Sequence, residues 1–261
     1  MSSLFGFSGT FPTLSMAATE FKLILRRPGT ASIVLLLPAV LIGLTYIGER
    51  PDSAARWGAT IGTHVVIALL LTVYVNAAVL MTNRRENLIF KRLRTSELGG
   101  TGIMLSICIP FVLLSMFQIV LVGGFNLATG ATVPQVPDLI GVAVGLGIVA
   151  TLAASAMTAA LTGTTERVQF TTMPILLGGA VGAQIVTADL DMNLRWAALV
   201  LPLVALADLI AKGWAGMDSG ITTLPANIEV SVVTVDIALT AGWCLLAIAV
   251  AVARWRWEPR S

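Results

Sequence analysis

Charged residues are scarce in this chain, and their scarcity excludes a soluble fold. Asp, Glu, Lys and Arg make up 11% of the 261 residues, against about 25% in an ordinary soluble domain. Apolar residues make up 56%, and the mean hydropathy is +0.89. So few charges cannot cover a surface that faces water. The sequence therefore predicts an all-α integral membrane protein.

Side chains for catalysis and metal binding are scarce as well. His64 is the only histidine, which excludes a zinc helix that needs two. Cys108 and Cys244 both lie inside apolar runs, without the spacing of a metal site. None of the three lysines has the sequence context of a nucleotide-binding P-loop. We expect no catalytic residue, metal or cofactor in this chain, and no ATP hydrolysis by that route.

Long apolar runs are what the sequence has in quantity. A helix that crosses a bilayer needs about 20 apolar residues. Six runs qualify: 31–47, 60–82, 102–123, 139–161, 170–187 and 230–253. We therefore divide the chain into a lead over residues 1–30, a six-span domain over 31–253 and a tail over 254–261.

Two further segments are expected to touch the membrane without crossing it. Apolar residues recur at helical spacing over 13–27, which predicts an amphipathic helix at the membrane interface. The stretch 196–211 is mostly apolar, but it is too short for a span and is broken by Pro202. Such a stretch is typical of a re-entrant segment. We place it on the outer face, between spans five and six.

The positive charges are distributed unevenly between the two sides. Twelve of the 16 Lys and Arg residues fall in the lead, the second and fourth loops and the tail, and four fall on the other side. Because positive loops stay inside, both termini are predicted to be cytoplasmic. Together with a composition rich in Ala, Gly and Val, this topology indicates a multi-pass protein of a bacterial inner membrane.

A few polar residues interrupt the apolar spans. Thr60, His64, Thr72 and Asn76 are spaced by multiples of four on the second span, and Asp236 lies in the last. These side chains either line a transport pathway or form hydrogen bonds between helices, because a buried polar group needs a partner or water. Asp236 and His64 are a candidate pair that faces the same water.

Four patterns in sequence order resemble the membrane subunit of type-2 ABC exporters, of the bacterial daunorubicin-exporter kind. They are Arg26-Arg27-Pro28 followed by Pro38, the run from Arg85 to Ser96, Thr164 to Gln169 followed by Pro174, and the apolar outer segment with Pro202. The second resembles a family loop that begins Arg-Glu. We aligned the glycine of that loop with Asn87 and its proline with Glu97. The first departure predicts a more continuous helix at Asn87.

The resemblance implies a partner and the residues that bind it. A separate cytoplasmic ABC ATPase would bind ATP and Mg²⁺ and dock on the loop after the second span. The expected docking residues are Arg85, Glu86, Leu88, Ile89, Lys91, Arg92, Leu93 and Arg94, with Glu166 and Arg167 from the next cytoplasmic loop. The leucines would insert into a groove of the ATPase and the charges would bind its rim. The alternative is that these arginines only set the orientation and contact anionic lipid.

The resemblance also implies the function. The chain would be a transport subunit and no enzyme, would pair with a second copy as a homodimer, and would export a drug, antibiotic or lipid-like amphiphile. Export of a polysaccharide or lipid-linked glycan is the nearest alternative. An ATP-independent carrier or a membrane enzyme would belong to a different class. We expect no role in nucleic-acid binding, since the net charge is only +2.

Overall fold

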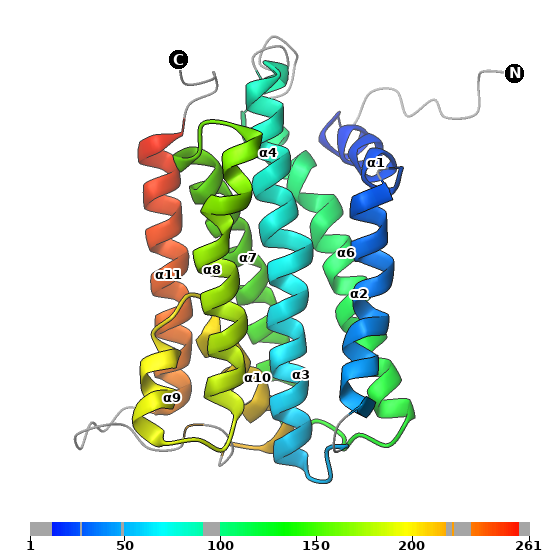
Figure 1. Cartoon of the computed structure of the whole chain (residues 1–261), viewed down its shortest axis with the longest axis vertical. Coiled ribbons are helices and arrows are strands. Elements are labelled where there is room, and N and C mark those ends of the chain that lie inside the picture. Colours follow the sequence, from blue (N-terminus) through cyan, green and yellow to red (C-terminus); the bar gives the residue numbers. More distant parts are fainter. Residues whose placement is uncertain are drawn as a thin grey trace, which may run out of the picture.

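The computed structural model describes residues 12–26, 28–47, 50–90, 100–217, 221 and 231–255. Within these residues the regular structure is helical throughout, and Figure 1 shows the helices as one bundle. The elements are α1 (Pro12–Leu25), α2 (Pro28–Ile47), α3 (Ala54–Ala68), the π-helix η1 (Leu69–Val75), α4 (Asn76–Glu86), α6 (Gly100–Ala128), α7 (Pro137–Leu161), α8 (Thr165–Thr187), α9 (Met192–Leu199), α10 (Val204–Ala215) and α11 (Val232–Arg254).

The predicted all-α membrane architecture is confirmed. Five helices are long and apolar enough to cross a bilayer, and α3, η1 and α4 form one of them, over Ala54–Glu86. The first predicted span, 31–47, lies within α2. The fifth was predicted to start at residue 170, but α8 begins at Thr165. The apolar core alone sets the expected bounds, whereas hydrogen bonding continues a helix past it.

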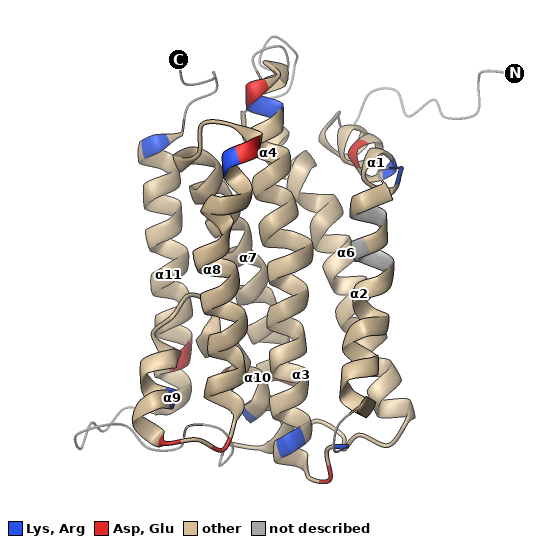
Figure 2. Ribbon diagram, viewed as in Figure 1, with Lys and Arg blue, Asp and Glu red and all other residues tan. Residues whose placement is uncertain are grey.

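The bundle has two ends that differ in what they carry (Figure 1). Helix α1, the last turn of α4, the start of α8 and the last turn of α11 lie at one end, which we call the α4 end. The turns around residues 50–53, 129–136 and 188–191 lie at the other, the α10 end. Charged residues gather toward these two ends (Figure 2). This distribution is the one expected when apolar helix middles face lipid.

The predicted lead helix is present as α1, which packs on α6 and α2 at the α4 end. Its protein-facing side consists of Ala17, Glu20 and Ile24, each less than 5% exposed. Leu14 and Leu25 are about half exposed, at 54% and 43%. Because buried and exposed apolar residues occur on the same helix, α1 has one side on the bundle and another free for a further apolar surface.

The second span contains a π-helical segment that hydropathy does not predict. Over η1 the wider turn disturbs the usual backbone hydrogen bonds. Asn76 follows this segment, and its Nδ2 donates to the carbonyl oxygens of Leu71 and Thr72, at 2.7 and 3.3 Å. The amide side chain therefore satisfies backbone acceptors inside an apolar span, where an unpaired carbonyl is costly.

The predicted re-entrant segment is confirmed as the pair α9 and α10, which meet at a bend of 116°. Helix α10 is buried over Val204–Trp214 and packs against α3, α7, α8 and α11. The bend uses a left-handed residue, Leu203, with φ of 65°. A helix that enters the bundle and returns must bury its polar backbone among neighbours, and four surrounding helices provide that burial.

Two glycines of α3 allow α10 to approach closely. A Cβ atom on Gly58 would lie 2.8 Å from the carbonyl oxygen of Ala211, and one on Gly62 would collide with the carbonyl oxygen of Ala207. On α8, Gly182 packs on Val204, whereas Gly178 has open space beside it. Small residues at helix contacts are typical of membrane bundles. In this protein Gly58 and Gly62 allow a full span, α3, to pack closely against the re-entrant helix α10.

Candidate coupling site

Arg85 lies inside the bundle at the α4 end. Its side chain is 1% exposed, and its guanidinium group donates to the carbonyl oxygens of Ala159, at 2.8 Å, and Thr162. These carbonyls belong to the C-terminal end of α7, where helix acceptors lack intrahelical partners and a cation is favourable. The burial corrects the interpretation of Arg85 as a residue on the exposed rim of a docking loop.

Glu86 is exposed but holds the start of the next helix. Its Oε2 accepts hydrogen bonds from the backbone N–H of Thr165, at 2.9 Å, and from the Thr165 hydroxyl, at 2.6 Å. A carboxylate at a helix N-terminus is favourable because the first N–H groups of the helix have no other partner. Glu86 thus caps α8 from α4.

Arg84 completes a set of three consecutive contacts. Its Nη2 lies 2.6 Å from both carboxylate oxygens of Glu20 on α1, and both side chains are largely buried. The last turn of α4 therefore binds α1 through Arg84, α7 through Arg85 and α8 through Glu86. We call Arg84, Arg85 and Glu86 the α4 clamp.

The docking candidates that follow the α4 clamp in the sequence begin with the exposed Leu88. Helix α4 ends at Glu86 and Asn87 is its C-cap, so the expectation of a more continuous helix at Asn87 is wrong. The left-handed conformation that favours glycine occurs one residue later, at Leu88, with φ of 57°. The Leu88 side chain is 41% exposed, and Ile89 is half-buried. Lys91, Arg92, Leu93 and Arg94 lie outside the described residues.

The second cytoplasmic-loop candidates lie at the same end. Glu166 and Arg167 are exposed in the first turn of α8, directly after the Thr165 that Glu86 caps. Buried Phe90, which follows Ile89, packs on Trp255 with ring centroids 5.9 Å apart. The fold thus brings the exposed Leu88 and the start of α8 to one end of the bundle, with the α4 clamp beneath them.

The polar stripe of the second span divides into two groups. Thr72 is fully buried and donates to Gln118 Oε1 on α6, at 2.6 Å, and Asn76 bonds to its own helix. Thr72 and Asn76 therefore form hydrogen bonds within the bundle, which was the alternative to lining a transport pathway. Thr60 and His64 instead line a cleft of about 350 Å³ at the α10 end.

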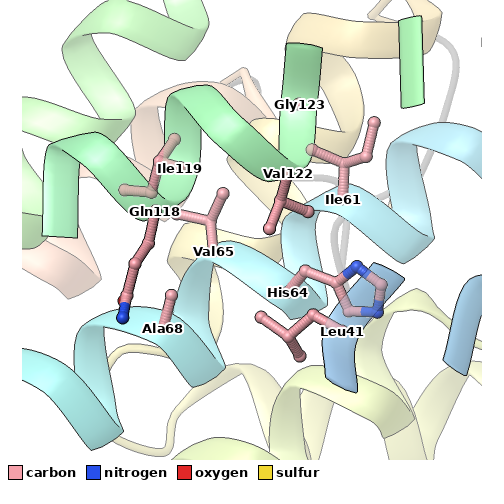
Figure 3. Close-up of a pocket in the computed structure, with 9 residues that line it drawn as sticks. All are labelled: Leu41, Ile61, His64, Val65, Ala68, Gln118, Ile119, Val122 and Gly123. Carbon is pink, nitrogen blue, oxygen red and sulfur yellow. The ribbon is translucent and has the colours of Figure 1, made fainter. Parts of the chain in front are cut away.

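That cleft lies between α2, α3 and α8. Its lining consists of Leu44, Thr45, Pro51, Ala59, Thr60, Thr63, His64, Ile67, Gln184, Thr187 and Ala188. His64 also borders a small adjoining pocket, drawn in Figure 3, where its ring lies beside Leu41. Its Nδ1 is buried and has no hydrogen-bond partner within the described part of the chain. The lining is mixed: five of its residues are apolar, and six carry a hydroxyl, imidazole or amide group.

Asp236 does not pair with His64, so that hypothesis is wrong. Its Oδ2 lies 3.0 Å from Lys212 Nζ on α10, and Lys212 also binds Asp208 one turn earlier. All three side chains are 1% exposed or less. Asp208 lies within the stretch 196–211, for which a re-entrant segment but no charged cluster was predicted. The signal was present, because Asp208 and Lys212 have i, i+4 spacing inside an apolar run.

The sequence was compared with curated proteins and with protein families. No curated protein sequence matches the chain. A match to the ABC-2 family transporter protein family covers residues 52–253, from the turn before α3 almost to the end of α11. The match includes the α4 clamp, the re-entrant pair and the cleft-lining parts of α3 and α8. With most of its length matched, the chain belongs to the ABC-2 family of membrane transporter proteins.

Proposed function

We propose that this chain is the permease subunit of an ATP-driven exporter, which moves an amphiphilic drug, antibiotic or lipid-like molecule out of the cell. The observation that carries the proposal is the α4 clamp directly beneath the exposed Leu88. A partner that pushes on Leu88 pushes on the end of α4. Through three polar contacts it then moves α1, α7 and α8 as well.

The energy source belongs to a separate chain. Family membership supports association with an ABC ATPase, which would carry ATP and Mg²⁺. Leu88 and Ile89, with Lys91, Arg92, Leu93 and Arg94, form the proposed docking surface, joined by Glu166 and Arg167. Apolar side chains at the centre of such a contact carry most of the affinity, and the surrounding charges set its specificity.

The proposed orientation follows from charge. Most of the Lys and Arg residues outside the spans belong to segments that lead to or leave the α4 end. Positive charge near span ends favours the cytoplasmic side. We therefore infer that the α4 end is cytoplasmic, that both termini lie there, and that the chain resides in a bacterial inner membrane.

The cleft supports an amphiphilic cargo and a second copy of the chain. The exposed Gln184 side chain lines an opening that would otherwise face lipid, which offers an amide no hydrogen-bond partner. Pairing of two copies across α2 and α8 would cover this opening. Hydroxyl and amide groups between aliphatic side chains suit a cargo that has both polar and apolar parts. A glycan chain would prefer aromatic stacking surfaces, and none of the described residues that line the cleft is a Phe, Tyr or Trp.

The experiment compares two matched substitutions in the full-length chain, co-expressed with a candidate ABC ATPase. Leu88→Asp places a charge at the proposed centre of docking. Val133→Asp makes the same change at an exposed position of the α10 end, where the side chain is 77% exposed. Loss of an anchor side chain costs about 2 kcal/mol, or roughly a thirtyfold loss of affinity. We expect Leu88→Asp alone to abolish copurification of the ATPase and ATP-dependent export of an amphiphilic dye from inverted vesicles.

The outcomes separate the alternatives. Equal copurification with both variants would refute docking at Leu88. Dye movement without the ATPase would favour an independent carrier. Export of a lipid-linked glycan with no dye transport would keep the ATP-driven permease and overturn the amphiphile assignment.

A further inference from the structure

The buried cluster of Asp208, Lys212 and Asp236 has more acidic than basic groups. It holds two carboxyl groups and one ammonium group, all at most 1% exposed. With all three groups ionised the cluster would carry one net negative charge in the interior. An uncompensated buried charge is costly, since the low-dielectric surroundings cannot replace its hydration. The cluster therefore needs one more positive charge.

The neighbouring helices do not supply that charge. Helix α7 contains no Lys, Arg or His, and the only basic residue of α11 is Arg254 at its other end. On α3, Arg56 is exposed beside Asp52 and His64 faces the cleft. On α8, Arg167 lies in the first turn, at the α4 end, and on α9 Arg195 donates to the carbonyl oxygen of Val186.

The sequence between α10 and α11 adds no basic residue. The stretches 218–220 and 222–230 lie outside the described residues, and they contain Asp218 and Glu229 but no Lys, Arg or His. Asp138, in the first turn of α7, adds another acid and no cation. The described residues hold no group of three His, Cys, Asp or Glu side chains that could bind a metal ion. A proton is the remaining positive charge that fits.

The hydrogen bonds indicate which carboxyl group holds it. Asp208 accepts at both oxygens, from Lys212 at Oδ2 and from the backbone N–H of Ile221 at Oδ1, at 3.0 Å. This is the pattern of an ionised carboxylate. Asp236 accepts from Lys212 at Oδ2, whereas its buried Oδ1 has no partner among the described residues. A buried carboxylate oxygen without a hydrogen-bond partner is unfavourable, and protonation of Asp236 at Oδ1 neutralises the carboxylate.

We propose that the Asp208–Lys212–Asp236 cluster is a binding site for a single proton, held on Asp236 Oδ1 while the re-entrant helix α10 is seated against α11. The two sides of the site belong to different helices, since Asp208 and Lys212 lie on α10 and Asp236 on α11. Movement of α10 away from α11 admits water, and hydration then stabilises the ionised carboxylate. Seating of α10 is thereby linked to proton binding.

The sign of this linkage is fixed. The seated state holds one proton more than the unseated state, so acid favours the seated state and alkali favours the unseated one. For one proton, the ratio of the two states changes by at most tenfold per pH unit. The site is separate from the α4 clamp and from the docking surface, and its test does not require an ATPase.

Infrared spectroscopy of the full-length chain in lipid nanodiscs tests the site directly. A protonated carboxyl group has a C=O stretching band that a carboxylate lacks. At neutral pH we expect this band in the unchanged protein, and we expect Asp236→Asn to remove it. Asp189→Asn is the matched control, because Asp189 is exposed at the same end of the bundle, and it should keep the band.

Two further variants keep the test decisive. Asp208→Asn leaves one carboxyl group and one ammonium group, so the cluster is neutral without a bound proton. The band should therefore disappear in this variant as well. Asp208→Asn replaces Asp236→Asn as the test if the latter does not fold. Lys212→Met leaves two acids without a cation and should strengthen the band. The same band in the unchanged protein and in both Asn variants, or no band at all, overturns the proposal. Loss of the band when sodium replaces potassium would identify a sodium site instead.

Discussion

Replacement of Arg85 distinguishes a residue that binds the ATPase from one that holds the bundle together. The perturbation is Arg85→Met, which keeps a long flexible side chain and removes the charge and the donors. In the structure these donors serve the carbonyl oxygens of Ala159 and Thr162 at the end of α7. Without them, both acceptors lose their partner in a buried place.

The magnitude follows from the two bonds. A hydrogen bond to a charged group contributes roughly 1.5–3 kcal/mol, and part of this is offset because the guanidinium must be desolvated. We therefore expect a net loss of about 3 kcal/mol. For a chain of this size, 1 kcal/mol shifts the melting temperature by roughly 2–4 °C. The apparent melting temperature of Arg85→Met should thus fall by about 6–12 °C.

The assay measures stability and partner binding on the same preparations. Unfolding of the purified chain is followed by intrinsic tryptophan fluorescence, and copurification with the ATPase is measured below the melting temperature. Arg85→Lys serves as the control, because a lysine keeps the charge with fewer directed donors and should lose about half as much. The reasoning would be refuted by a variant that melts like the unchanged protein but fails to bind the ATPase.

Two other predictions concern packing and buried polar groups. Gly62→Ala should destabilise the chain by about 1–3 kcal/mol, because its Cβ collides with a backbone oxygen that has no room to move; Gly178→Ala, with open space beside it, should be neutral or slightly stabilising. Equal melting temperatures for the two alanine variants would contradict the close approach of α3 and α10. Thr72→Val should cost about 1–3 kcal/mol by leaving Gln118 Oε1 buried without this donor, and the added change Gln118→Leu should recover most of that loss. A double variant no more stable than the single one would show that the Thr72 hydroxyl does more than serve Gln118.

The all-α membrane architecture could be predicted because it depends on properties that a sequence displays directly. Length and hydropathy identify spans, and the stretch 196–211, which is short and interrupted by Pro202, was predicted to be re-entrant; in the structure α9 and α10 meet there at a bend of 116°. The π-helical segment η1 was not predictable in this way. Its residues are as apolar as those of an ordinary span, and the hydrogen bonds of Asn76 that support it depend on local backbone geometry.

The sequence predicts that the docking candidates share one end of the bundle, but not which neighbours their side chains contact. A basic residue after a span satisfies the orientation rule whether its side chain faces the cytoplasm or the protein. Arg85 turns inward because the end of α7 offers it carbonyl oxygens, and the sequence does not reveal that neighbour. In the same way, Asp236 was assigned a partner on the second span by depth alone. Its true partner lies on a helix that enters the bundle and turns back.

The geometry of one helical turn explains why the α4 clamp reaches three helices. Consecutive residues of an α-helix are rotated by about 100°, so Arg84, Arg85 and Glu86 leave the axis in three different directions. One direction meets Glu20 of α1, one the last carbonyls of α7, and one the first N–H of α8. The charges also match what they meet, since the arginine lies at a helix C-terminus and the glutamate at an N-terminus. A tilt of the end of α4 must therefore break or carry its contacts with α1, α7 and α8, which is why the proposed docking at Leu88 would act on three helices besides α4.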